Sequence, residues 1–377
     1  MIYLDNSATT QPYEEAIDSF ITVSKKYFGN PSSLHNLGSQ AEGLLTKSRE
    51  QLAKLLKVKP SEIIFTSGGT EGNNLAIKGI ALQNRSRGNH IITTSIEHPS
   101  VTDACKHLEQ FGFKVTYLPV NENGFASLHD LKEAINEETI LVSIIHVNNE
   151  VGTIQPIKEI GHFLERYPKI AFHVDHVQGI GKVPLHLKQA KIDVCTMSAH
   201  KFHGLKGTGI LYIREGVRLS PLFNGGSQEM QFRSGTENVA GIVAMSKALR
   251  MTLEKHEIKI ERMSAIKRTL MDELSNINLI KLNTSKEQSA PHIVNFSING
   301  LKSEVFVHEL EKHHIFVSTT SACSSRRKAP SKTLLAMGKE IKIAESGIRI
   351  SLSYNNKIEE VPIIIEAIDQ SLNKLRR

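Results

Sequence analysis

The chain has 377 residues, of which 40% are hydrophobic and 23% charged, a composition typical of globular proteins and a length sufficient for two domains. Its formal net charge of +7 is modest, and no stretch is apolar enough to cross a bilayer, so we expect a cytoplasmic protein that binds neither a membrane nor nucleic acid directly. Three cysteines are too few for a disulfide framework, so we expect free thiols.

Short apolar runs alternate with amphipathic stretches along the first two thirds of the chain. The runs predict buried strands at 63–66, 91–94, 115–120, 140–147, 170–174, 194–197 and 210–213. Apolar residues at helical spacing predict helices at 128–135 and 157–164. This alternation predicts an α/β fold with a mostly parallel central sheet sandwiched by helices. Ligands of such sheets bind at the carboxyl ends of the strands, so the residues after each run are the candidates for a site.

The last third of the chain has a different pattern. A long helical region at about 238–274 is followed by strand patterns at 293–298, 315–317 and 348–352. We therefore expect a smaller α+β domain. The predicted division is a large domain of residues 15–255 and a small domain of residues 1–14 plus 256–377.

The first candidate for a binding site is a glycine pair that follows the strand at 63–66. Gly68 and Gly69 precede Thr70, which we expect at the N-cap of a helix. Bare backbone amides at a helix N-terminus can hold a phosphate group. An ordinary strand–turn–helix connection explains the same residues, and the sequence does not match the nucleotide-binding glycine motifs.

The second candidate is Asp175, which ends a predicted buried strand. A buried carboxylate there needs a cationic partner, and the protonated pyridine nitrogen of pyridoxal 5′-phosphate would be one. Val177 would lie against the ring, and Gln178 would bond its phenolic oxygen. Asp175 could instead cap the next turn. His173 and Asp175 also match the opening of a non-haem iron site, although such sites usually occur in all-β folds.

Two further strand ends carry reactive side chains. Lys201 follows the strand at 194–197 and could form a Schiff base, with Ser198 and His200 near a phosphate. A surface lysine in a glycine-rich hairpin is the alternative. His98 follows the strand at 91–94 and could stack on a cofactor and act as acid or base, although most single histidines are structural.

The three cysteines differ in context. Cys105 lies on an apolar helical stripe and Cys195 within a strand, so both are expected in the core. Cys323 lies in a polar, loop-like run, and three cations follow it closely at 326–328. These charges favour the thiolate, so Cys323 is the candidate reactive cysteine.

Taken together, the motifs resemble those of the cysteine desulfurases of the NifS/IscS type, in the class V aminotransferase superfamily. The resemblance runs almost from end to end of the chain. The matching segments are YLDNSATT at 3–10, FGNPSS at 28–33, SGGTE at 67–71, HVNNE at 146–150, RSGTE at 233–237 and SAC at 321–323.

The resemblance implies a homodimer of fold type I with pyridoxal 5′-phosphate as its cofactor and no metal. It implies that Lys201 holds the cofactor, that Asp175 pairs with its pyridine nitrogen and that His98 stacks on its ring. The other implied contacts are Gln178 and Asn149 to the cofactor oxygen and the substrate, Thr70, Ser198 and His200 to the phosphate, Thr236 reaching across from the partner subunit, Val177 against the ring, and Arg349 to the substrate carboxylate.

The implied reaction converts L-cysteine to L-alanine and leaves a persulfide on Cys323. The sulfur would pass to an acceptor protein of iron–sulfur cluster assembly or tRNA thiolation. Two departures from the family pattern are His176, where alanine is usual, and the cations at 326–328. A selenocysteine lyase or an aminotransferase would share Lys201 and Asp175 but would not need Cys323. An inactive scaffold protein would need none of these three residues.

Overall fold

The structure is a computed structural model that describes residues 1–254, 256–319 and 329–376. A seven-stranded sheet forms the centre of the larger lobe, in the order β2-β8-β7-β6-β5-β3-β4. All of its strands run parallel except β8, which is antiparallel to both of its neighbours. The strands are β2 (Ile63–Thr66), β3 (His90–Thr94), β4 (Lys114–Leu118), β5 (Thr139–Ile145), β6 (Ala171–Asp175), β7 (Val194–Ser198) and β8 (Gly209–Ile213).

The strands of this sheet are buried because helices cover both faces. Every residue of β2, β3, β5, β7 and β8 is buried, whereas β4 at the edge is partly exposed. The helices are α1 (Glu14–Lys26), α2 (Asn36–Leu56), α3 (Gly69–Gln83), α4 (Pro99–Glu109), α5 (Leu128–Ala134), α6 (Ile157–Leu164) and α7 (Val239–Leu253). One core joins the sheet to α2, α6 and α7, and another joins it to α3 and α4. The predicted α/β sandwich is confirmed.

The smaller lobe is built on a four-stranded antiparallel sheet in the order β12-β13-β10-β9. Its strands are β9 (Ile280–Leu282), β10 (Ile293–Ile298), β12 (Ser318–Thr319) and β13 (Gly347–Ser351). Its helices are α8 (His256–Ser275), α9 (Ser303–Lys312), α10 (Lys332–Ala336), α11 (Ile341–Glu345) and α12 (Glu360–Leu375). Leu270, Phe296, Phe306 and Ile368 belong to its hydrophobic core. The domain boundaries given above stay a prediction.

Two sequence predictions in this part of the chain were wrong in detail. The helical region at 238–274 is two helices, because Glu254 adopts ψ of 128° and turns the chain out of α7. Of the strand pattern at 315–317, only residues 315 and 316 form a strand, and a second strand begins just beyond it at Ser318. β11 (Ile315–Phe316) pairs with β1 (Ile2–Tyr3), and Ser318–Thr319 pairs with β13.

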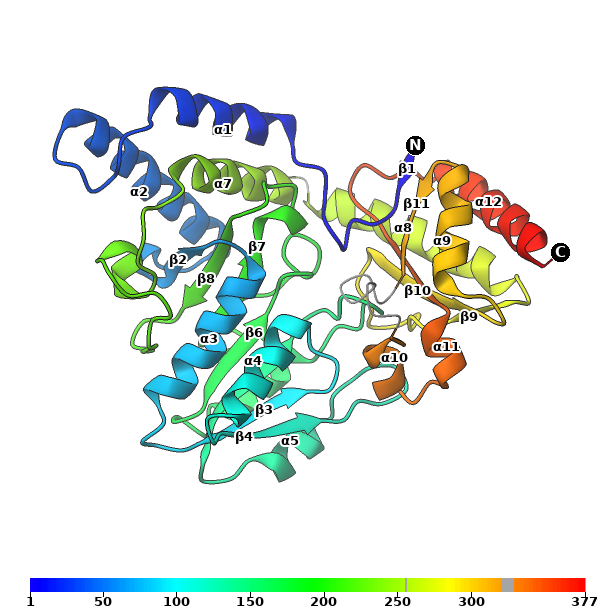
Figure 1. Ribbon diagram of the computed structural model, residues 1–377, viewed down its shortest axis with the longest axis horizontal. Helices are drawn as coiled ribbons and strands as arrows, with labels where there is room; N and C mark the ends of the chain where they lie inside the picture. The colour runs from blue at the N-terminus through cyan, green and yellow to red at the C-terminus, as the bar shows by residue number, and fades with distance from the viewer. Residues whose placement is uncertain (255, 320–328, 377) are drawn as a thin grey trace.

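The N-terminal segment connects the two lobes. β1 lies beside β11 in the smaller lobe, and the chain then crosses to α1 on the larger lobe (Figure 1). Residues 5–10 therefore run past the carboxyl edge of the large sheet, where the backbone amide of Thr10 donates to the carbonyl of His200 at 2.9 Å. No helix in the described part of the chain is long and apolar enough to cross a membrane.

Candidate active site

A cavity of about 400 Å³ opens at the carboxyl edge of the large sheet. It lies beyond the ends of β6 and β7, beside the N-terminus of α3, and Arg349 of β13 closes it from the smaller lobe. The predicted residues that line it are Thr70, His98, Asn149, Asp175, Val177, Gln178, Ser198, His200, Lys201 and Arg349. Ser7, Ala8, Gly69, Asn73, Ser100 and Ile145 complete the lining.

Asp175 is 3% exposed and forms one wall of the cavity. Its Oδ1 accepts a hydrogen bond from the amide of Val177 at 3.0 Å, and its Oδ2 accepts one from Nδ2 of Asn73 at 2.8 Å. Both donors are uncharged, so they orient the carboxylate without neutralising it. A cationic group of a ligand is therefore the partner that this buried charge requires.

His98 is connected to Asp175 through Asn73 and Ser100. It occupies the N-cap of α4, where its Nδ1 accepts from the amide of Ser100 at 3.1 Å and contacts Oγ of Ser100 at 2.8 Å. Nδ2 of Asn73 lies 2.8 Å from the same Oγ. Burial holds the pKa of His98 below its usual range, so the ring is neutral at neutral pH. Sequence analysis missed Asn73, although its position one helical turn after Gly69 places both on one face of α3.

Lys201 lies on a short 3₁₀ turn, Ala199–Lys201, directly after β7. Its Nζ donates to the carbonyl of Ser7 and to that of Ala8, the latter at 2.7 Å. Its own carbonyl accepts from Nζ of the buried Lys182 at 2.6 Å. Burial lowers the pKa of Lys182 to about 7. The N-terminal segment therefore positions the side chain of Lys201, and Lys182 supports the backbone of Lys201.

The N-terminus of α3 forms the end of the cavity suited to a phosphate. Gly68, with φ of 151°, is the N-cap residue, and no described side chain caps the helix. A Cβ on Gly69 would lie 2.9 Å from Cγ2 of Val177, so a larger residue there would press on the wall of the cavity beside the first amides of the helix. The prediction of Thr70 as N-cap was wrong, because the left-handed turn at Gly68 starts the helix two residues earlier.

His200 and Ser198 lie at the same end of the cavity. Ser198 ends β7, and its Oγ is 3.6 Å from the position of a Cβ on Gly68. Nδ1 of His200 contacts Oγ1 of Thr9 at 3.2 Å. Burial, together with the neighbouring lysines, lowers the pKa of His200 to about 4, so a neutral ring faces the phosphate end.

Arg349 forms the opposite end of the cavity. Its Nη2 donates to Oδ1 of Asp5 at 2.8 Å, and its Nη1 donates to the carbonyl of Asn149 at 2.9 Å. Its side chain is 5% exposed, and its buried Nε finds no partner among the described residues. The guanidinium is thus held in place with its Nε–H unused, which suits the binding of a carboxylate. Sequence analysis did not identify Asp5 as its partner.

Unused buried polar atoms in the cavity wall test whether pyridoxal 5′-phosphate fits. Nε2 of Gln178 donates to the carbonyl of Ser7 at 2.9 Å, whereas its Oε1 has no partner among the described residues, as is true of Oγ of Ser7. Buried polar groups normally find partners, so a polar ligand is expected to supply them. The phosphate end, Asp175 without an ion-pair partner among the described residues, Lys201 and these atoms match the phosphate, pyridine, aldehyde and phenolic groups of the cofactor.

Thr236 and the two described cysteines lie outside this cavity. Thr236 is exposed and does not contribute to the cavity of its own chain, and Cys323 falls outside the described residues. Cys105 and Cys195 are fully buried, as expected, and burial raises the pKa of Cys105 to about 12. Neither thiol is available for chemistry.

The alternative of an iron site gains no support from His173. Its Nδ1 contacts Oγ of Ser143 at 2.8 Å, and its Nε2 contacts Oγ1 of Thr196 at 3.0 Å, so both ring nitrogens are engaged within the sheet. Residues 1–254, 256–319 and 329–376 contain no group of three or more side chains placed to hold a metal ion.

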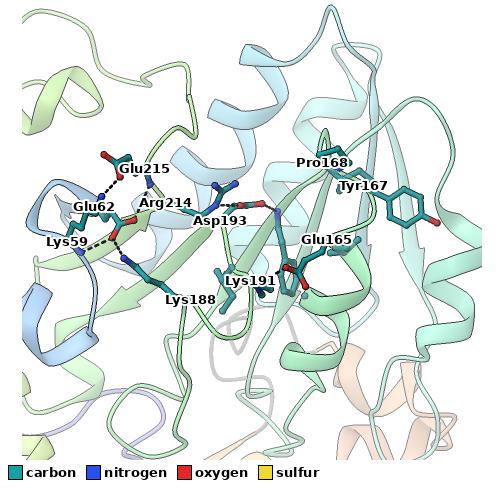
Figure 2. A pocket seen from close by; sticks show the side chains of 15 residues that line it. Lys59, Glu62, Glu165, Tyr167, Pro168, Lys188, Lys191, Asp193, Arg214 and Glu215 are labelled. Carbon is teal, nitrogen blue, oxygen red and sulfur yellow. Dashed lines mark hydrogen bonds and ion pairs between the residues drawn. The ribbon is translucent and has the colours of Figure 1, made fainter.

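A second hollow, of about 570 Å³, lies at the opposite edge of the sheet, near the starts of β6 and β7 (Figure 2). Each cation labelled there has a carboxylate partner. The pairs are Lys59–Glu215, Lys188–Glu62, Lys191–Glu165 and Arg214–Asp193. Because its charges are balanced, this hollow lacks the unpaired polar groups of the cavity around Lys201.

Comparison with known families accounts for the cavity. The family model of the class-V aminotransferases matches residues 2–364. The chain belongs to this family. Its cofactor is therefore pyridoxal 5′-phosphate, in agreement with the residues that line the cavity.

Within this family, the chain is similar to proteins of the NifS and IscS type. A NifS/IcsS protein homolog of Lactobacillus delbrueckii subsp. bulgaricus is 48% identical over 372 residues, which cover 98% of this chain and 97% of that protein. The cysteine desulfurase IscS of Clostridium botulinum is 43% identical over 378 residues, covering 100% and 95%. A solved structure of a NifS-like protein superposes with a TM-score of 0.93 at 39% identity and covers 99% of each chain. The resemblance inferred from the motifs and the fold type are confirmed.

Proposed function

We propose that this class-V family member is a cysteine desulfurase, which converts L-cysteine to L-alanine and retains the sulfur as a persulfide on Cys323. The observation that carries the proposal is the convergence of Lys201, Asp175 and Arg349 on one cavity. The 43% identity to a protein named cysteine desulfurase IscS supports the choice of cysteine as substrate.

The cofactor end of the cavity divides the work among three groups. When bound, pyridoxal 5′-phosphate supplies an electron sink for the charge that develops at the substrate carbon. Asp175 provides the negative charge that keeps a proton on the ring nitrogen, and Asn73 holds this carboxylate in place. Lys201 would hold the cofactor, and its amine would serve as the base for the substrate's α-proton.

The substrate end of the cavity orients free cysteine. Arg349 binds the carboxylate, and Asn149 lies beside it because the two residues share a hydrogen bond. The thiolate of Cys323 attacks the substrate sulfur, the carbon–sulfur bond breaks, and the bonding pair stays with the carbon fragment. Protonation of this fragment gives alanine. The persulfide retains the sulfur, so the step needs no external oxidant.

A homodimer and an acceptor protein complete the proposal. The large apolar side chains exposed on the larger lobe include Phe28 at 71%, Leu34 at 102%, Phe223 at 50% and Met230 at 43%. A second copy of the chain would cover such residues and bring Thr236 to the neighbouring cavity. The sulfur would pass, in the cytoplasm, to a protein of iron–sulfur cluster assembly or tRNA thiolation.

The proposal is tested by adding L-cysteine and a reductant to the purified protein and measuring alanine and sulfide together. We expect equal amounts of the two products and a visible absorption band of the bound cofactor that Lys201→Ala abolishes. Cys323→Ser is expected to keep this band and to lose sulfide release. Sulfide at the normal rate from Cys323→Ser would overturn the role of the thiol, and a cofactor band without sulfide would move the reaction to another amino acid.

A further inference from the structure

Two buried imidazoles, those of His146 and His176, face each other behind the cavity. Their Nδ1 atoms lie 2.8 Å apart, and their ring centroids lie 4.8 Å apart at an interplanar angle of 39°. Each residue is 3% exposed. Neither ring lines the cavity, although His176 directly follows Asp175.

The sheet brings the two histidines together. Ile145 of β5 is the register partner of Asp175 of β6, so the next residue of each parallel strand lies at the same level. The backbone continues the sheet there, with the amide of His146 donating to the carbonyl of Asp175 at 2.9 Å and the amide of His176 donating to that of Thr196 at 2.9 Å.

Only one proton lies between the two rings. Burial lowers the pKa of His146 to about 4 and holds that of His176 well below its usual range, so both rings are neutral at neutral pH. A neutral imidazole has one donor and one acceptor nitrogen, so one Nδ1–H donates to the other Nδ1. The contact is thus a buried hydrogen bond rather than a repulsive pair.

Gly179 makes room for this hydrogen bond. A Cβ at this position would lie 2.5 Å from Nδ1 of His176 and 2.6 Å from Nδ1 of His146. Gly179 is not among the glycines with a left-handed φ, so its backbone does not itself require glycine. The two rings therefore impose the glycine at position 179.

We propose that His176, bound to His146 and accommodated by Gly179, is a positioning residue that fixes the turn at 175–178 against the cofactor. The cavity side of this turn presents Asp175, Val177 and Gln178, and the imidazole fills the space behind it. The carbonyl of His176 also accepts from the amide of Ile180 at 3.0 Å, which closes the turn. Loss of the imidazole leaves a void, and this void lets Asp175 withdraw from the pyridine nitrogen of the cofactor.

This inference requires only the cofactor and goes beyond the proposed reaction. Its test is the affinity of the cofactor-free protein for pyridoxal 5′-phosphate, measured by absorbance titration. We expect His176→Ala to weaken binding about tenfold, the equivalent of one lost buried hydrogen bond. His176→Asn, whose side-chain amide can replace Nδ1, is expected to bind within about threefold of the wild type.

Gly179→Ala supplies the decisive comparison. Its methyl group collides with both rings, so alone it is expected to weaken cofactor binding more than His176→Ala does. In the double variant His176→Ala/Gly179→Ala the collision with His176 is gone and only the one with His146 remains, so Gly179→Ala is expected to weaken binding less in this background than in the wild type. An equal penalty for Gly179→Ala in both backgrounds would overturn the inference.

Two further readouts separate positioning from general destabilisation. The pH midpoint of the cofactor's visible band, which the charge of Asp175 influences, is expected to shift in His176→Ala and to return in His176→Asn. The unfolding midpoint of the cofactor-free protein reports the structural cost by itself. If the unfolding midpoint falls in His176→Ala while the affinity and the band stay unchanged, His176 is structural and the proposal fails.

Discussion

Nδ2 of Asn73 lies 2.8 Å from Oδ2 of Asp175 and 2.8 Å from Oγ of Ser100. A single side-chain amide therefore connects the carboxylate to the serine that contacts the ring of His98. Asn73 is 1% exposed and belongs to α3, the helix whose first residues form the phosphate end of the cavity. One helix therefore positions both ends of the cofactor.

Replacement of Asn73 tests this connection. Asn73→Ala removes the oriented donor to a buried carboxylate, so we expect pyridoxal 5′-phosphate to bind about tenfold to a hundredfold more weakly, given about 1.5–3 kcal/mol for a hydrogen bond to a charged group. Titration of the cofactor-free protein measures the change. Asn84→Ala, near the other end of the same helix, is the matched control and should leave the affinity unchanged.

The close approach of Gly69 to Val177 predicts a steric effect at the phosphate end. Gly69→Ala places a methyl group 2.9 Å from Cγ2 of Val177, and we expect cofactor affinity to fall by at least about tenfold. Gly43→Ala in α2 is the control, because a Cβ there meets nothing within 4 Å. That variant should stabilise the protein by about 0.5–1 kcal/mol with unchanged affinity. Equal affinities for both variants would contradict this explanation of Gly69.

Replacement of Arg349 should weaken the binding of the substrate and leave the binding of the cofactor unchanged. Arg349→Lys loses the planar fork that holds Asp5 and Asn149 at once, so we expect KM for L-cysteine to rise about tenfold or more while the visible band persists. Steady-state kinetics over a range of cysteine concentrations measure the effect. Arg268→Lys, an exposed change on α8, is the control. An unchanged KM in Arg349→Lys would exclude Arg349 as the carboxylate ligand.

The buried carboxyl group of Glu97 predicts a pH-dependent stability. Burial raises its pKa from 4.5 to about 8, although Oε1 accepts from Oγ1 of Thr94 and from the amide of Ile145. The folded chain therefore binds one more proton than the unfolded chain between these pH values, so the contribution of Glu97 to stability is complete below about pH 4.5 and is lost as the pH rises through about 8.

Glu97→Gln mimics the protonated carboxyl group at every pH. We expect the variant and the wild type to unfold at similar urea concentrations near pH 4.5, and the variant to become more stable by a few kcal/mol above pH 8, at about 1.4 kcal/mol for each pH unit between the two pKa values. Glu109→Gln at the C-terminal end of α4 is the control. A constant difference between variant and wild type across this range would show that Glu97 is ionised in the fold.

The sequence was a good guide where one local feature determines the outcome. The run at 63–66 became β2 with the predicted bounds, because a short apolar run that ends at a glycine pair is typical of a strand buried on both faces. Asp175, Ser198 and Lys201 converge because adjacent strands end at one edge of the sheet.

The residues that were missed depend on contacts between distant parts of the chain. Asp5 meets Arg349 across 344 positions, and Ser7 meets Gln178 across 171, separations at which spacing along the sequence carries no signal. The break after α7 was missed because apolar residues continue into α8, where periodicity does not reveal the extended ψ of Glu254. The close fit between His176 and Gly179 could not be predicted either, because the sequence does not show that the ring of His146 lies against both residues.

The crossing of the N-terminal segment has a consequence for the order in which the protein matures on the ribosome. Residues 2–8 are synthesised first, yet their partners include the carbonyl of His314 and the amide of Ser351 near the other end of the chain. The carbonyls of Ser7 and Ala8 that position Lys201 thus reach their places only after β13 has been made. Such long-range contacts form late in folding. The contacts that complete the support of Lys201 therefore become available only after nearly the whole chain has been synthesised.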